Sequence, residues 1–249
     1  MNKNRKKALI CAASVFFILI AIAAVYFFQY NAVGCRMTVP YRSSFCEITD
    51  NVYINTGYSG DRKETIRLIG SAKERVTEFF GDLSCLNETV IIICDDDRLL
   101  TKLGGDHDTM SVYFPVEKHY ISVSNEYLSI DILAHELTHA ELHTRLSASA
   151  QKKLPTWFDE GLALQNDYRE QYGPEAWIEQ TENGKKVLPL EDMDTPSEFY
   201  AGAAEDRRFR YLNAKHEVGV WMNIHQQKGL LELFDKLNNS EEFDIAYFK

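Results

Sequence analysis

The feature that most restricts the fold of this chain is an uncharged apolar run over residues 8–28. A helix of that length rises about 31 Å, which is close to the thickness of the hydrocarbon core of a bilayer. Four basic residues lie within residues 1–7, and none immediately follows the run. The sequence therefore predicts a basic cytoplasmic tip, one membrane-spanning helix, and a remainder that is periplasmic or extracellular.

A signal sequence is the alternative interpretation of this run, because it also places basic residues before an apolar segment. Its apolar part is typically shorter, about 7–15 residues, which favours a membrane anchor. The small residues Ala32, Val33 and Gly34 before Cys35 nevertheless resemble a cleavage or lipidation site. A secreted or lipid-anchored protein, left after signal cleavage, therefore remains the alternative to a single-pass membrane protein.

The charge of the chain argues against one class of partner. The formal net charge is −10, and because four of the 27 basic residues lie in the tip, the remainder carries about −14. A nucleic-acid-binding groove needs the opposite charge, so nucleic acid is excluded as a partner. The acidity is interpreted as a solubility feature.

Four cysteines, Cys35, Cys46, Cys85 and Cys94, follow the apolar run. An even number of cysteines in an oxidising compartment predicts two disulfides. Pairing within the two close pairs is the simplest of the three connectivities, and four buried thiols are the alternative. The absence of a C-x-x-C spacing argues against a metal site built from these cysteines.

The order of the predicted elements indicates the fold class. Strands and one helix precede residue 129, and only helices follow it, so we expect an α+β fold with two lobes. Residues 29–46 are predicted to be a linker and residues 47–249 the folded domain. Hydrophobic periodicity predicts strands at residues 51–56, 88–94, 110–114 and 119–123, helices at 62–80, 129–146, 155–168, 207–227 and 230–237, and a loop-rich segment at 170–198.

The strongest chemical signal is the H-E-x-x-H motif formed by His135, Glu136 and His139 within the predicted helix 129–146. Histidines four residues apart lie on one face of a helix, so both imidazoles can bind one metal ion. Glu136 lies beside them, where it can accept a proton from water. A surface helix with two incidental histidines is the alternative.

A catalytic zinc needs a third protein ligand, and two residues are candidates. Eight residues of helix separate His135 and His143 by about 12 Å, which is too far for bonds of about 2 Å to a shared ion. Glu160 lies on the next predicted helix, 21 residues after His139, and its apolar neighbours would dry the site. We therefore expect Glu160 to be the ligand and His143 to be solvated or an outer partner.

The sequence HELTH at residues 135–139 followed by WFDEGLA at residues 157–163 resembles the gluzincin clan of zinc metallopeptidases, especially the small peptidase MA-like proteins. The resemblance implies one zinc per chain held by His135, His139 and Glu160, with Glu136 as general base. It also implies a zincin-like fold, with a cleft between a strand-containing upper lobe and a helical lower lobe.

Two departures from the clan pattern limit what the resemblance implies. The interval between the second histidine and the third ligand is slightly longer than in the best-known members. An aminopeptidase motif of the type G-x-M-E-N is absent. An aminopeptidase assignment therefore has no support.

The resemblance further implies a residue that stabilises the oxyanion. Gluzincins usually use a tyrosine or histidine on the helix after the third ligand, which points to Tyr211 and, as a weaker candidate, His216. Independently of the resemblance, Asp159 and Asp131 are candidates to accept hydrogen bonds from the outer nitrogens of the metal-binding histidines.

These observations predict a membrane-anchored, extracytoplasmic zinc metallopeptidase that hydrolyses peptide bonds of a peptide or protein substrate. A non-catalytic zinc-containing module that binds a peptide or an envelope partner is the first alternative. A structural anchor protein without metal is the second.

Overall fold

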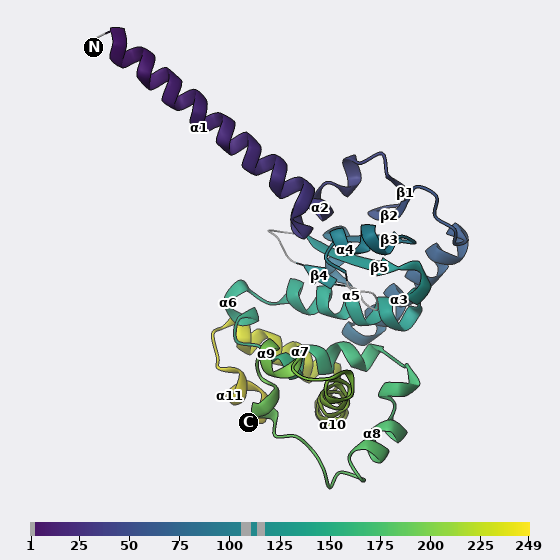
Figure 1. Cartoon of the computed structure of the whole chain (residues 1–249). Helices are drawn as coiled ribbons and strands as arrows, with labels where there is room; N and C mark the ends of the chain where they lie inside the picture. The colour runs from purple at the N-terminus through teal and green to yellow at the C-terminus, as the bar shows by residue number, and fades with distance from the viewer. Residues whose placement is uncertain (1–2, 106–110, 114–117) are drawn as a thin grey trace. The chain divides into compact units, whose positions relative to one another are not determined.

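The computed structural model describes residues 3–105, 111–113 and 118–249. The protein is mixed α/β, with one long apolar helix at its N-terminus (Figure 1). The chain divides into two compact units, one made of Met1–Ser59 and Val90–Glu126 and the other of Gly60–Thr89 and Tyr127–Lys249. We call these the sheet unit and the helical unit.

The apolar run forms helix α1 (Lys3–Tyr30) of the sheet unit. Its segment Ala13–Tyr30 is long and apolar enough to cross a membrane, and none of that segment is buried in the protein. Large side chains such as Phe16 and Phe17 are more than half exposed. Such a continuous apolar surface is unfavourable in water, so α1 fits a membrane span or a signal sequence.

The sheet unit contains a five-stranded sheet of order β1-β2-β3-β5-β4. The pairs β1–β2 and β4–β5 are antiparallel, and β2–β3 is parallel. The strands predicted at 51–56, 88–94 and 119–123 are confirmed, and the strand predicted at 110–114 is present in its described part. Strand β1 was not predicted, because its residues do not alternate regularly between apolar and polar, and most of them are partly or fully exposed. The strands are β1 (Phe45–Thr49), β2 (Val52–Asn55), β3 (Thr89–Cys94), β4 (Ser111–Tyr113) and β5 (His119–Ser124).

The segment predicted to be a linker, residues 29–46, is folded. It contains helix α2 (Ala32–Met37) and a short 3-10 turn, and it leads into β1. Its apolar residues Cys35, Val39 and Phe45 are buried in the core cluster of the sheet unit. Burial of these side chains, together with a hydrogen bond from Arg36 to the carbonyl oxygen of Leu103, explains why the segment does not remain extended.

Among the residues that the structure describes, no disulfide joins the cysteines, and Cys35, Cys46, Cys85 and Cys94 are all thiols. The structure therefore contains neither predicted disulfide. Cys35 and Cys94 contribute to the same apolar cluster, and the Sγ of Cys35 donates to the carbonyl oxygen of Gln29 at 3.3 Å. Burial raises the pKa of both Cys85 and Cys94 to about 12, which keeps these thiols protonated and unreactive.

The helical unit is built around α3, α5, α7 and α10. The helix predicted at 62–80 is confirmed, and it ends at Gly81, whose φ of 90° favours glycine. The two helices predicted at 207–227 and 230–237 form one element that is interrupted at Gln226. The predicted loop-rich segment 170–198 contains short helices. The helices outside the N-terminal segment are α3 (Arg62–Phe80), α4 (Asp97–Lys102, in the sheet unit), α5 (Ile130–Arg145), α6 (Ala148–Gln151), α7 (Thr156–Ala163), α8 (Pro174–Gln180), α9 (Pro196–Phe199), α10 (Ala204–Asn238) and α11 (Phe243–Phe248).

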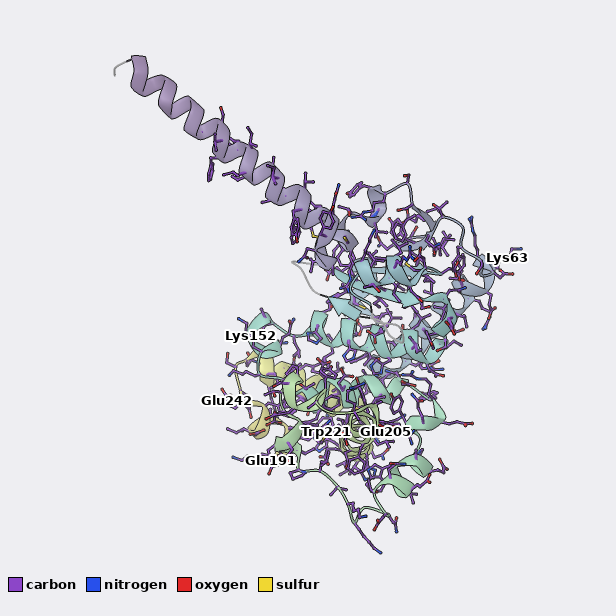
Figure 2. All side chains as sticks on the ribbon, in the orientation of Figure 1. Lys63, Lys152, Glu191, Glu205, Trp221 and Glu242 are labelled. Atoms are coloured by element: carbon purple, nitrogen blue, oxygen red, sulfur yellow. The ribbon has the colours of Figure 1, made fainter. Side chains whose placement is uncertain are left out.

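Helix α7 is at the centre of this unit, because it packs against both α5 and α10, while α3 packs against α5. Trp157 and Phe158 of α7 contact Phe243 and Tyr247 of α11 edge to face. Trp221 of α10 stacks on Tyr247 and is buried, whereas the charged side chains that Figure 2 labels are exposed. This apolar packing fixes α7 against its neighbours.

A close approach of α7 to α10 leads to a stability prediction. A Cβ at Gly161 would lie 2.5 Å from the carbonyl oxygen of Ala214 and 2.7 Å from Cγ2 of Val218. We expect Gly161→Ala to destabilise the protein by about 1–3 kcal/mol, because the helices must separate. The matched control is Gly70→Ala in α3, where a Cβ meets nothing within 4 Å and is expected to stabilise by about 0.5–1 kcal/mol. Denaturant unfolding of both variants measures the difference, and equal stabilities would contradict the tight contact.

Candidate metal centre

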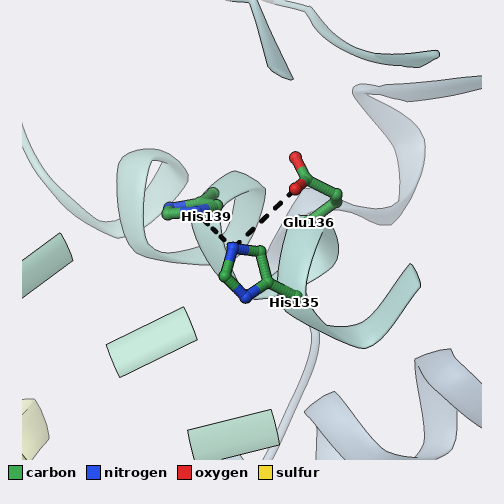
Figure 3. A group of neighbouring side chains, drawn as sticks. All are labelled: His135, Glu136 and His139. Carbon is green, nitrogen blue, oxygen red and sulfur yellow. Dashed lines mark hydrogen bonds and ion pairs between the residues drawn. The ribbon is translucent and has the colours of Figure 1, made fainter. Parts of the chain in front are cut away.

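Helix α5 places the H-E-x-x-H residues in the interior of the helical unit. Ser129 caps its N-terminus by accepting a hydrogen bond from the backbone N–H of Ile132 at 3.2 Å. The following turns are buried, so His135 and Glu136 are only 8% and 6% exposed. The spacing of four residues brings Nε2 of His135 and Nε2 of His139 to 3.2 Å from each other, as the sequence predicts (Figure 3).

The residues His135, Glu136 and His139 form a possible metal-binding cluster, in which the ligand atoms all lie within 4.8 Å of one another. Figure 3 shows the carboxylate of Glu136 beside the two imidazoles, and its Oε1 lies 3.8 Å from Nε2 of His135. Burial raises the pKa of Glu136, and the facing imidazoles offset only part of this effect. A carboxylate with a raised pKa beside a possible metal-binding pair is suited to accept a proton.

Glu160 of α7 approaches the same pair of nitrogens. Its Oε2 lies 3.5 Å from Nε2 of His135 and 3.6 Å from Nε2 of His139. This oxygen is buried and has no hydrogen-bond partner among the described residues. Tetrahedral zinc with bonds of about 2.0–2.2 Å places its ligand atoms about 3.3–3.6 Å apart. The three atoms, at 3.2, 3.5 and 3.6 Å from one another, are therefore close to the spacing of three corners of such a site.

The electrostatics of Glu160 agree with this arrangement. Burial acts to raise its pKa, but the facing His139 and His135 outweigh burial and lower the pKa to about 2. Conversely, burial acts to lower the pKa of His139, and Asp159 and Glu160 raise it well above its ordinary value. The buried carboxylate is thus ionised, which is the form that binds a metal.

Each histidine has a carboxylate near its outer nitrogen. Asp159 Oδ1 lies 2.6 Å from Nδ1 of His139, which confirms the predicted outer partner. Asp167 Oδ2 lies 3.7 Å from Nδ1 of His135, longer than a hydrogen bond, and Nε of Arg169 lies 2.9 Å and 3.0 Å from the two oxygens of Asp167. A carboxylate hydrogen-bonded to the outer nitrogen, as Asp159 is to His139, orients a metal-binding imidazole and fixes its tautomer.

Two other predicted outer residues have different outcomes. The prediction for Asp131 is wrong, because its Oδ1 pairs with Arg75 at 2.6 Å and accepts the backbone N–H of Tyr168. Asp131 lies in the first turn of α5, where these two contacts occupy its Oδ1. His143 is an outer residue as predicted, and its Nε2 lies 2.8 Å from Oδ2 of Asp159.

Tyr211 of α10 lies among aromatic rings near the cluster. Its ring centre is 5.0 Å from that of Phe199 and 5.7 Å from that of Tyr172. Burial and the negative charges of Glu160 and Glu136 raise its pKa, so its hydroxyl stays protonated. Its role at an oxyanion stays a prediction. The weaker candidate, His216, stacks on Trp177 with ring centres 3.6 Å apart.

Sequence reasoning missed three residues of this site, namely Asp167, Arg169 and Tyr200. The hydroxyl of Tyr200 donates a hydrogen bond to Oε1 of Glu160, which leaves Oε2 directed at the histidines. Desolvation of this hydroxyl and the charge of Glu160 raise the pKa of Tyr200. Tyr200 follows the predicted loop-rich segment, where no periodicity marks which side chains turn inward.

Comparison with known proteins gives no family assignment. No family model matches the chain, and no curated protein matches it. The functional interpretation therefore depends on the geometry of this cluster and on the motif that forms it.

Proposed function

We propose that this protein is a membrane-anchored, extracytoplasmic zinc metallopeptidase of the gluzincin type, with one zinc per chain. One observation carries the proposal. Nε2 of His135, Nε2 of His139 and Oε2 of Glu160 are 3.2–3.6 Å from one another, and the carboxylate of Glu136 lies beside them. Two imidazoles and one carboxylate form a ligand set that leaves a fourth position open, as catalytic zinc sites require.

The residues present fit zinc rather than a harder cation. Mg²⁺ and Ca²⁺ prefer oxygen ligands, whereas this cluster offers two nitrogens. The buried Oε2 of Glu160 has no hydrogen-bond partner among the described residues, which is costly unless a cation satisfies it. When bound, zinc lowers the pKa of a water molecule towards about 7 and polarises a carbonyl group.

The chain's own residues then supply proton transfer and charge stabilisation. Glu136 accepts a proton from the attacking water and delivers it to the leaving amine nitrogen, so one water is consumed and the peptide C–N bond breaks. Tyr211 donates a hydrogen bond to the oxygen that becomes negative as the carbonyl is attacked. Tyr200 holds Oε1 of Glu160, so that the carboxylate offers a single oxygen at the ligand position.

The proposed location and fold follow from two further features. Helix α1 is long and apolar enough to anchor the protein, and the basic residues before it favour a cytoplasmic N-terminus. We further propose a zincin-like fold, in which the mixed sheet would belong to the strand-containing lobe and the helices of the other unit to the helical lobe. We therefore propose a peptide or protein substrate in the periplasm or outside the cell.

A metal analysis combined with a hydrolysis assay tests the proposal on the full chain purified in detergent. We expect one zinc per chain, cleavage of a mixed peptide library, loss of cleavage after chelation, and recovery when zinc is added back. A protein without zinc would refute the metal site. Stoichiometric zinc without any cleavage would favour the alternative of a zinc-containing binding module.

A further inference from the structure

We propose that His143 is a positioning residue that holds the zinc ligand His139 in place through Asp159. The inference depends on the proposed zinc site, and it assigns a role to a histidine that lies too far along α5 to bind the metal with His135. His143 follows His139 by one helical turn, and both imidazoles face the same carboxylate on α7. Asp159 thus connects two histidines of α5 and directly precedes Glu160 in the chain.

The geometry gives each oxygen of Asp159 its own imidazole. Oδ1 lies 2.6 Å from Nδ1 of His139, and Oδ2 lies 2.8 Å from Nε2 of His143. The three side chains are mostly buried, with 13% exposure for His139, 22% for Asp159 and 14% for His143. Hydrogen bonds to a charged group in such surroundings are short and strong.

The protonation pattern follows from what each atom can do. Nε2 of His139 faces His135 and Glu160, and when this nitrogen binds the proposed metal, the ring proton lies on Nδ1 and is donated in a hydrogen bond to Asp159. An ionised carboxylate only accepts, so Nε2 of His143 also donates. With both oxygens held by donors, the carboxylate plane cannot rotate, and His139 keeps the tautomer and the orientation that a metal needs.

Loss of the His143 imidazole would leave Oδ2 of Asp159 mostly buried and without the hydrogen bond that His143 donates. The carboxylate would then turn towards another donor or towards water, and its hydrogen bond to His139 would weaken. Because Asp159 and Glu160 are neighbours on α7, the same movement would also disturb the third ligand. The effect should therefore appear as weaker zinc binding, even though His143 itself does not touch the metal.

A set of variants of the full chain tests this role by zinc affinity, measured by competition with a chromogenic chelator. We expect His143→Leu to weaken zinc binding by about 10-fold, since outer partners of zinc ligands typically contribute 10–100-fold. His143→Gln should stay within about three-fold of the parent, because its amide N–H can donate from nearly the position of Nε2. His143→Ala provides a second variant without a donor in case the leucine disturbs folding, and melting of the metal-free proteins checks this.

A double variant separates action through Asp159 from a general structural effect. Asp159→Ala alone should weaken zinc binding by about 10–100-fold, and adding His143→Leu should weaken it no further. The visible spectrum of the cobalt-substituted protein should change in His143→Leu and resemble the parent in His143→Gln. The inference would be overturned if His143→Gln bound zinc as weakly as His143→Leu. It would also be overturned if adding His143→Leu to Asp159→Ala weakened zinc binding by its full separate factor.

The outcomes also distinguish this inference from the proposed function. A parent protein that binds no zinc overturns both. A parent that binds zinc with an affinity indifferent to His143 overturns the positioning role alone. Zinc binding that depends on His143 in a protein that cleaves no peptide supports the positioning role and overturns the peptidase.

Discussion

The Glu136→Gln variant is expected to keep one zinc per chain and to hydrolyse peptides about 10²–10⁴-fold more slowly than the parent. Glutamine preserves the size of the side chain but cannot accept a proton. Glu136 is 6% exposed and its Oε1 lies 3.8 Å from Nε2 of His135, so no bulk water can easily replace it as base. Parallel measurement of zinc content and initial rates on one peptide substrate gives the result.

A matched control for this substitution is Glu74→Gln, which changes an exposed glutamate of α3 in the same way. It should leave both zinc content and rate unchanged. Full activity in Glu136→Gln would assign the base to another residue. Loss of zinc in that variant would instead make Glu136 a ligand, which the clustering of His135, Glu136 and His139 also permits.

The second large effect is expected at Glu160. Glu160→Ala should weaken zinc binding by more than about 100-fold, beyond the 10–100-fold range of outer partners, because it removes a ligand atom itself. The buried Oε2 lies 3.5 Å and 3.6 Å from the two histidine nitrogens, which is the spacing of atoms that share one ion. Competition with a chelator of known affinity measures the change, and peptide hydrolysis should fall in parallel at limiting zinc.

The hydrogen bond on the other oxygen of this carboxylate offers a comparison. Tyr200→Phe keeps Glu160 and removes only the donor to Oε1, so its loss should remain within the range of an outer partner. If the Glu160→Ala variant bound zinc as tightly as the parent, Glu160 would be excluded as the third ligand. The gluzincin assignment would then lose its basis, while a metal site on α5 could remain.

Much of the local structure around the site could be predicted from the sequence. The pairing of His135 and His139 depends only on the geometry of α5, and the helix forms because its apolar residues follow the helical period. Glu160 was predicted to join the two histidines because it lies on the next helix in an apolar frame, and its Oε2 lies 3.5 Å and 3.6 Å from their Nε2 atoms. The helix at 62–80 was predicted because its apolar residues follow the helical period, and in the structure Asp61 caps its start and Gly81 ends it.

Contacts between distant parts of the chain were harder to predict. Tyr200 lies 40 residues after Glu160, and Asp167 lies 32 residues after His135, with no repeat or motif that connects them. The structure lacks the predicted disulfides, and residues 29–46 are not an extended linker, for a related reason. Both predictions relied on positions close together in the sequence, whereas Cys35 and Phe45 are buried in the core of the sheet unit.

The sequence by itself determined the apolar helix at the N-terminus and the two histidines with Glu136 on α5, because hydrophobicity and helical spacing act over a few residues. Only the tertiary structure decided which side chains surround them. Asp159 meets both His139 and His143, and Tyr200 meets Glu160, because α7 packs against α5 and α10. Such contacts depend on how the helices pack together in a common core. The spacing of residues within one segment of the sequence does not reveal this packing.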